Sequence, residues 1–325
     1  MKAAASAPGK VILTGEHFVV HGEPALVMAI NRHIEVTAEE RTDKAIRVSG
    51  LGYSGLFEEK KFKPERGGEE ARRVLEPIKI SAEAVLRRQD EKRGLSIEAV
   101  SALPVAAGLG SSGASAVSTV AAVGRLLGAE LSVEEVIGFA TEAERFVHVN
   151  PSGIDQSISA YGGVLSYRMD EGVSRLNVES VVPVVIGNTG FGRNTGRLVD
   201  GVRVRIECVP GVMRHLIDSA GDVTAEAIDA LRRGDMGQLG LLMDVNHGLL
   251  VALGVSSEEL DKLVYAARRG GALGAKLTGA GGGGCVVALT PLEAKKAVAQ
   301  SISEAGGTPL LVEKEQQGVR SWMMK

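Results

Sequence analysis

The sequence predicts a two-domain protein of mixed α/β structure, and three observations support this prediction. The chain has 325 residues, whereas single domains usually hold about 100–200 residues. Hydrophobic residues make up 44% and charged residues 24%, a balance that supports a buried core. Strand-like segments alternate with amphipathic helical segments in both halves of the chain. The pattern shifts near residues 175–183, so we expect one domain over 1–175 and a second over 176–325.

In the first half, short apolar runs separated by turn signals indicate strands. We expect them over residues 2–5, 10–14, 34–37, 46–48 and 95–100. Longer periodic segments predict helices over 69–92, despite Pro77, and over 113–127. A further helix begins at Ser132, which forms a capping box with Glu135. Residues 50–68 are expected to form a surface loop.

The second half shows the same alternation. Strands are expected over residues 181–186, 285–289 and 309–313. Helices are expected over residues 197–219, 223–233, 236–253, 256–270 and 291–305.

Composition excludes several classes of protein. A net charge of −3 gives no general attraction to nucleic acid or anionic membranes, and 3% aromatic residues argue against base-stacking surfaces. The two cysteines, Cys208 and Cys285, exclude a disulfide scaffold and fit a reducing compartment. Residues 99–124 carry no charge but are mostly Ala, Gly and Ser, so they predict a buried loop and helix rather than a membrane span. We therefore expect a soluble, cytoplasmic protein.

The segment Ala106-Ala107-Gly108-Leu109-Gly110-Ser111-Ser112-Gly113 follows a strand and opens a helix. Glycines let the backbone approach a ligand, and the helix N-terminus offers free N–H groups with a positive dipole end. This arrangement predicts a cradle for phosphates, in which a serine hydroxyl can bind Mg²⁺. Two alternatives remain open. GLGSSG also fits a dinucleotide-binding fingerprint with Glu130 as the acidic residue, or the segment is a turn that packs a helix on a sheet.

A second cluster lies near the N-terminus. Lys10 lies at the start of an apolar strand, where a solvated lysine is not expected, and it could stabilise a phosphate or polarise a hydroxyl. Glu16 and His17 could hold a polar substrate through hydrogen bonds. The alternative for each is structural: Lys10 extends its ammonium to water from a strand edge, and His17 is an ordinary loop histidine.

The third cluster is the glycine-rich run from Lys276 to Cys285. Its glycines cost conformational entropy on folding, so some group is expected to approach that backbone closely. A flexible linker is the alternative, although this run leads directly into an apolar strand.

Two acidic residues could complete a site for phosphoryl transfer. Glu144 and Asp155 lie eleven positions apart, with Asp155 in a turn after Ser152 and Gly153. One carboxylate could bind Mg²⁺ while the other receives a hydroxyl proton. Alternatively, Glu144 belongs to a solvated helix face or pairs with His148 on a metal, and Asp155 caps a helix.

These clusters, in this order, resemble the motifs of the GHMP kinase superfamily, which is named for galactokinase, homoserine kinase, mevalonate kinase and phosphomevalonate kinase. The mevalonate kinase family is the most similar branch. Gly15 to Gly22 resembles its GEHxVVHG motif, Lys276 to Cys285 matches KLTGAGGGGC at every position, and Arg193-Asn194-Thr195 resembles its RNT segment. Asp244 to Val255 is similar to a shortened MNxxHxxLxxLGV region. One departure is Gln156, where that family usually has Asn.

The resemblance implies an α+β fold with an N-terminal ribosomal-protein-S5-like domain, a C-terminal ferredoxin-like domain and an active site between them. It implies that Asp155 is the catalytic base, that Lys10 polarises the attacking hydroxyl, and that the loop over 106–113 holds the ATP phosphates. Ser112 and Glu144 resemble the Mg²⁺ ligands. The substrate-side residues implied in the same way are Glu16, His17, Ser152 and Thr195.

The activity implied by the resemblance is transfer of the ATP γ-phosphoryl group to the 5-hydroxyl of (R)-mevalonate, in isoprenoid precursor synthesis, by a homodimer. Three alternatives remain. The chain could be another GHMP small-molecule kinase, a nicotinamide-dependent oxidoreductase that uses GLGSSG, or a non-catalytic sensor of ATP or a metabolite. Retention of both Lys10 and Asp155 argues against a sensor, which needs no proton acceptor.

Overall fold

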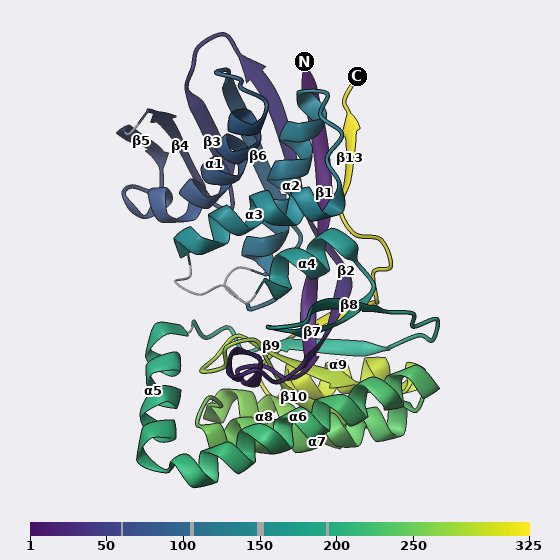
Figure 1. Ribbon diagram of the computed structural model, residues 1–325. Coiled ribbons are helices and arrows are strands. Elements are labelled where there is room, and N and C mark those ends of the chain that lie inside the picture. Colours follow the sequence, from purple (N-terminus) through teal and green to yellow (C-terminus); the bar gives the residue numbers. More distant parts are fainter. Residues whose placement is uncertain (60, 105–106, 148–152, 193–194) are drawn as a thin grey trace.

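The computed structural model describes residues 1–325 with the exception of residues 60, 105–106, 148–152 and 193–194. The side chains of residues 146–147, 195 and 197 are also outside the description. Two β-sheets form its frame, one in the upper and one in the lower part of Figure 1. Among the described residues the first sheet has nine strands, of which seven run in the order β13-β1-β2-β6-β3-β4-β5, while β7 pairs with β2 and β8. Their bounds are β1 Lys2–Thr14, β2 Ala25–Arg41, β3 Ile46–Gly50, β4 Tyr53–Glu58, β5 Lys61–Arg66, β6 Gly94–Ser101, β7 Val164–Arg168, β8 Gly172–Leu176 and β13 Arg320–Met323.

The prediction of two short strands at 2–5 and 10–14 is wrong, because β1 is one strand of 13 residues. Its pairing with β2 shifts in register between Pro8 and Gly9, and such a bulge accommodates a proline inside a strand. The expected strand at 34–37 is the centre of the much longer β2. The first half of β2 is buried on both faces, so it lacks the alternation that marks a half-exposed strand.

The prediction of a surface loop over residues 50–68 is also wrong, because β4 and β5 form an antiparallel hairpin there. Phe57 and Phe62 face each other across it with ring centroids 4.7 Å apart. The outer strand β5 is exposed and rich in charge, with Pro64 inside it, as is typical of protected sheet edges. Those charges hide the strand pattern in the sequence.

Helices of the first domain pack against this sheet (Figure 1). They are α1 Glu70–Arg88, α2 Ser111–Leu126, α3 Val133–Val147 and α4 Ile154–Tyr161. The capping box is confirmed: Ser132 Oγ accepts from the Glu135 N–H at 3.1 Å, and Glu135 Oε2 accepts from the Ser132 N–H at 3.0 Å. Helix α2 is buried along nearly its whole length, which explains its run of small and apolar residues.

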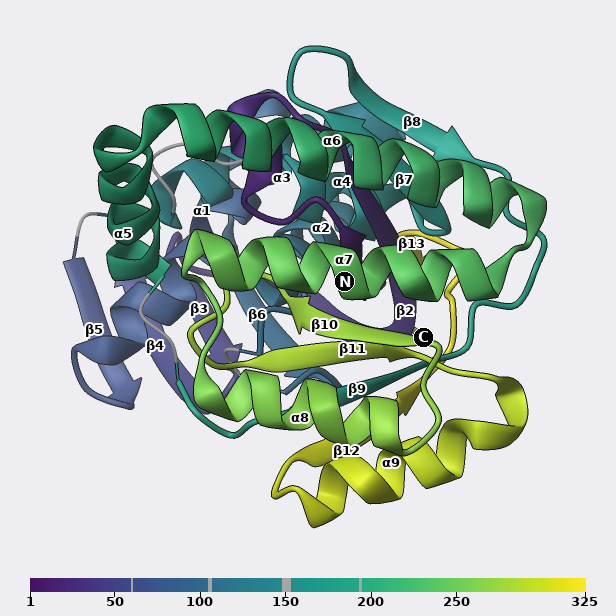
Figure 2. The same ribbon diagram turned by 90° about the horizontal axis from the view of Figure 1, so that it is seen from below.

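The second sheet has the order β10-β11-β9-β12 and is covered by long helices, which Figure 2 shows from below. Its strands are β9 Val184–Asn188, β10 Gly274–Thr278, β11 Cys285–Leu289 and β12 Thr308–Val312. The helices are α5 Thr195–Cys208, α6 Pro210–Arg233, α7 Met236–Leu253, α8 Glu258–Arg269 and α9 Lys295–Glu304, with short 3₁₀ turns η1 Phe18–His21 and η2 Leu292–Ala294.

The predicted strand over 285–289 and the helix over 236–253 are confirmed. The helices expected at 197–219 and 223–233 are divided differently. The break falls at Val209, because Pro210 lacks an N–H and suits the first turn of a new helix, and α6 then continues without interruption to Arg233. Strand β9 begins at Val184 rather than at residue 181, directly after Pro183.

The chain crosses from the first sheet to the second between the end of β8 and the start of β9, and its last strand then returns to the first sheet. Strand β13 pairs antiparallel with β1, so both ends of the chain lie side by side (Figure 1). The division at residue 175 stays a prediction.

One described helix, α7, is long and apolar enough to cross a membrane by length and composition alone. Because 44% of this segment is buried and a core helix passes the same test, the finding is weak support for a span. The uncharged stretch over 99–124 contributes instead to β6 and to the buried helix α2.

Candidate active site

The structure brings Lys10 and Asp155 together. Lys10 lies in β1, where its backbone N–H donates to the Leu109 carbonyl at 2.9 Å. Its Nζ is 3.1 Å from Asp155 Oδ1. The lysine side chain is 5% exposed and the aspartate side chain 26%, so the pair has one side open to solvent. This burial excludes the alternative in which Lys10 extends its ammonium to water from a strand edge.

Helix α2 approaches this pair through two glycines. A Cβ atom on Gly110 would lie 2.7 Å from the Lys10 side chain, and one on Gly113 would lie 2.7 Å from the backbone and Cβ of Asp155. Such distances are too short for real Cβ atoms, so glycine is what permits the contact. The N-terminus of α2, with its unpaired N–H groups and positive dipole end, is therefore placed beside the Lys10–Asp155 pair.

Glu144 and Ser112 adjoin the same pair. The Ser112 hydroxyl donates a hydrogen bond to the buried Glu144 carboxylate. Burial, and secondarily the negative charge of Asp155, raises the pKa of Glu144 to about 7, while the Ser112 hydrogen bond and the Lys10 charge oppose this rise. The carboxylates of Glu144 and Asp155 therefore interact electrostatically, as a site for a cation would require.

The donor atoms here suit a hard cation. Ser112 and Glu144 offer a hydroxyl and a carboxylate oxygen, and Mg²⁺ binds through one or two such groups plus phosphate oxygens and water. Within the described part of the chain, no three His, Cys, Asp or Glu residues form a group that could hold a metal by themselves. The residues present thus fit Mg²⁺ that arrives with a nucleotide.

Several predicted site residues lie outside the described residues. These are Ala106 and Ser152, the alternative ligand His148, and Arg193 and Asn194 of the RNT segment. Thr195 begins α5, but its side chain is also outside the description.

The dinucleotide alternative for GLGSSG is not supported by the topology. That fingerprint belongs to a βαβ unit in a parallel sheet. Among the described strands of the first sheet, the β3–β6 pairing alone is parallel, and β6, which precedes the loop, is antiparallel to β2.

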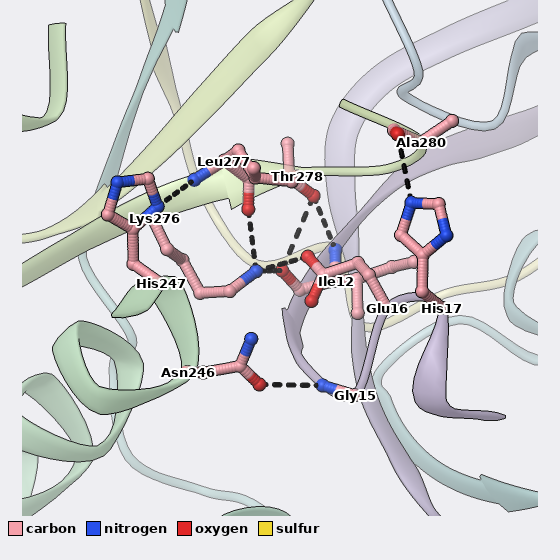
Figure 3. A network of polar contacts seen from close by, with 10 residues as sticks. All are labelled: Ile12, Gly15, Glu16, His17, Asn246, His247, Lys276, Leu277, Thr278 and Ala280. Atoms are coloured by element: carbon pink, nitrogen blue, oxygen red, sulfur yellow. Dashed lines mark hydrogen bonds and ion pairs between the residues drawn. The ribbon is translucent and has the colours of Figure 1, made fainter. Parts of the chain in front are cut away.

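Beyond Lys10, the end of β1 and the turn after it bind to the second sheet and α7. We call residues 12–17 the connecting segment (Figure 3). The Ile12 N–H donates to Thr278 Oγ1 at 3.0 Å, and the Gly15 N–H donates to Asn246 Oδ1 at 3.0 Å. His17 has a φ of 61°, and its Nε2 donates a hydrogen bond to the Ala280 carbonyl at 2.9 Å. The segment therefore joins β1, which carries Lys10, to the second sheet and α7.

Glu16 does not face solvent. Its side chain is 1% exposed and forms an ion pair with Lys276, whose side chain is 0% exposed. Burial raises the pKa of Glu16 and lowers that of Lys276, while their mutual attraction opposes both shifts. A direct substrate contact by this carboxylate stays a prediction.

His247 on α7 lies close to Lys276 and contacts the next residue of β10. The Leu277 N–H donates to His247 Nδ1 at 3.4 Å, and His247 Nε2 lies 3.2 Å from Asp261 Oδ1. Nδ1 is therefore the acceptor and Nε2 the protonated nitrogen of a neutral ring. Burial, assisted by the Lys276 and Arg268 charges and opposed by Asp261, lowers the pKa of His247 to about 4.

No role was predicted from the sequence for Lys276, Asn246 or His247, although each lies in a motif that resembles the family. One signal was available for Lys276: a lysine inside a short apolar strand is expected to have a buried partner. For the other two, only the folded structure shows that α7 lies against the connecting segment.

The late glycine run is held by protein groups. The Gly282 N–H donates to the Val255 carbonyl at 2.8 Å, and the Gly284 N–H donates to the Phe191 carbonyl at 3.1 Å. The close approach expected at this run is therefore made at least in part by neighbouring backbone. A flexible linker is excluded.

Known proteins resemble this chain in sequence. Residues 76–163 match the family model described as GHMP kinases N terminal domain, and residues 227–308 match GHMP kinases C terminal. The chain is 42% identical to a mevalonate kinase from Pyrococcus furiosus, with 98% of both chains covered. It is 38% identical to a mevalonate kinase from Aeropyrum pernix, with 88% of both chains covered.

Solved structures are similar as well. A mevalonate kinase from L. major, crystallised in complex with R-mevalonate, superposes with a TM-score of 0.83 at 27% identity, over 96% of both chains. A Lactococcus lactis galactokinase in complex with galactose gives a TM-score of 0.80 at 21% identity, over 98% of this chain and 95% of the other, which is a likeness of fold.

Proposed function

The chain belongs to the mevalonate kinase family of the GHMP kinases, and from this premise we propose that Lys10 and Asp155 perform its phosphoryl transfer. The α+β fold of two GHMP domains and the family resemblance drawn from the sequence are confirmed. The proposed reaction is transfer of the ATP γ-phosphoryl group to the 5-hydroxyl of (R)-mevalonate. The observation that supports it best is the 3.1 Å contact of Lys10 Nζ with Asp155 Oδ1 beside the N-terminus of α2.

In this mechanism Asp155 accepts the proton of the acceptor hydroxyl. The O–H bond breaks as the oxygen bonds to phosphorus and the bond from phosphorus to ADP breaks. An alcohol is a weak nucleophile, so a carboxylate within hydrogen-bond reach accelerates this step. The partial exposure of the Asp155 side chain lets the proton pass to water afterwards.

Lys10 supplies positive charge at the same place. Its ammonium, buried and held by Asp155, can donate to the hydroxyl oxygen and to the transferred phosphoryl group. The N–H groups at the start of α2 would bind the phosphates of ATP, as the loop over 106–113 predicts. Phosphoryl transfer depends chiefly on such positioning and charge neutralisation.

Ser112 and Glu144 would hold Mg²⁺ in this site. When bound, the ion neutralises phosphate charge. Burial of Glu144 keeps that carboxylate out of bulk water, and the Ser112 hydroxyl orients it.

The mevalonate pocket is proposed on the side of His17. His17 is held against Ala280 next to the end of β1, and Glu16 adjoins it. Ser152 and Thr195 are retained as further substrate contacts from the family resemblance. We also propose that the protein is a homodimer and acts in the cytoplasm.

A steady-state assay tests the proposal. Purified protein with MgATP is offered mevalonate, phosphomevalonate, galactose and homoserine, and the phosphorylated position is read by ³¹P NMR. We expect mevalonate 5-phosphate as the preferred product. Turnover of another acceptor would retain the kinase chemistry but reassign the pocket, and ATP binding without any turnover would favour a sensor.

A further inference from the structure

Lys276 and Glu16 form a fully buried ion pair that the proposed mechanism does not use. Moving two charges out of water is costly, and apolar residues of similar size often stabilise a fold better. Stability alone is therefore a poor explanation for this pair, and its contacts indicate what else it does.

Three oxygen atoms surround Lys276 Nζ. Nζ donates to Glu16, to the Leu277 carbonyl at 2.6 Å and to the Ile12 carbonyl at 3.4 Å. The three N–H donors of an ammonium match these three oxygen atoms. Figure 3 shows the contacts meeting at Nζ, and two of the three partners, Ile12 and Glu16, belong to the connecting segment.

One of these contacts leads directly to Lys10. Ile12 lies two residues after Lys10 in β1, so their side chains point to the same face of the strand. The Ile12 backbone is held at both polar atoms: its N–H donates to Thr278 Oγ1, and its carbonyl accepts from Thr278 Oγ1 and from Lys276. The position of the catalytic lysine along its strand is thereby tied to β10.

The other contact holds the turn after β1. Glu16 precedes His17, whose φ of 61° is unfavourable for a residue with a side chain. Such a conformation persists where its surroundings fix it. Here Lys276 fixes Glu16 on one side, and the Ala280 carbonyl fixes the His17 ring on the other.

We propose that Lys276 is a positioning residue, which acts through Ile12 and Glu16 to hold Lys10 and His17 in the arrangement that phosphoryl transfer requires. This inference rests on the proposed function of Lys10. A misplacement of about 1 Å far from the chemistry can cost about 10²-fold in rate, so the loss is expected mainly in kcat.

Three variants test it. K276M removes the ammonium and leaves Glu16 unpaired, whereas E16Q/K276M removes both charges. K79M is the control, because Lys79 forms a partly buried ion pair with Glu83 on α1, which packs against β3 and β4. For each variant we would measure kcat, both KM values, Tm, and hydrogen exchange of residues 10–17 without substrates.

We expect K276M to lower Tm and to lower kcat by about 10- to 100-fold, with KM for ATP changed less than about threefold. The double variant should regain Tm but not kcat, and both should exchange the Ile12 and Gly15 amides faster than wild type. K79M should leave kcat and this exchange at their wild-type values.

Recovery of kcat together with Tm in the double variant would overturn the proposal, and so would unchanged exchange. If K276M fails to fold, the double variant retains the test. If the wild type does not phosphorylate mevalonate, the proposed function fails, while the exchange measurement and any acceptor that is turned over still test the positioning.

Discussion

Substitution of Gly113 by alanine should lower both the stability and the activity of the protein. The added Cβ would lie 2.7 Å from Asp155 atoms, where ordinary contact begins near 3.4 Å, so helix α4 must move by about 0.7 Å relative to α2. Overpacking of this kind typically costs about 1–3 kcal/mol of stability. Because the displaced residue is the proposed base, we also expect kcat to fall by about 10- to 100-fold.

The control is Gly138→Ala. Gly138 lies within α3, is exposed, and has no atom within 4 Å of an added Cβ. Alanine there should stabilise the protein by about 0.5–1 kcal/mol and leave kcat unchanged. Urea unfolding and steady-state kinetics of both variants give the comparison. A G113A variant with wild-type kcat and undiminished stability would refute the reasoning.

Further substitutions address the remaining groups. Asp155→Asn should lower kcat by at least about 10² with little change in KM for ATP, and near-normal turnover in a steady-state assay would remove Asp155 as the base. Ser112→Ala should raise KM for MgATP by about tenfold, because Glu144 loses the hydrogen bond that orients it; an unchanged Mg²⁺ titration would contradict this. The pKa of His247 is about 4 in the folded protein against 6.5 in the unfolded chain, so the unfolded state binds the proton first as pH falls. The free energy of unfolding should therefore be highest above pH 6.5 and decline by about 3 kcal/mol toward pH 4. Urea unfolding at pH 7.5 and 5 measures this decline, which should be smaller in His247→Gln.

The core of the candidate site could be predicted from the sequence because its residues lie in motifs with a chemical reason. Lys10 was unusual in an apolar strand, and the glycines at 110 and 113 indicated a close approach. The structure shows what approaches them: the Lys10 side chain and the backbone of Asp155. The sequence could not show this, since the partners are distant in the chain.

The fold was predicted well where local rules decide it and poorly where pairing decides it. The capping box at Ser132 and the helix over 236–253 depend on neighbouring residues, and both are confirmed. The outer hairpin strand β5 is exposed and charged, so it carried no alternation to detect. The final strand β13 is exposed as well, and its partner β1 lies at the other end of the sequence. The burial of Glu16 could not be predicted for the same reason, because its partner Lys276 lies on β10.

The pairing of β13 with β1 has a consequence for the order in which the protein can fold during synthesis. Strand β1 leaves the ribosome first, yet one of its edges is completed only by residues 320–323. The first sheet must therefore wait with an open edge beside β1 while the whole second domain is made, and an open edge is a site for mispairing. Separate expression of residues 1–175 would leave that edge uncovered, so the first domain should be more prone to aggregation alone than within the full chain.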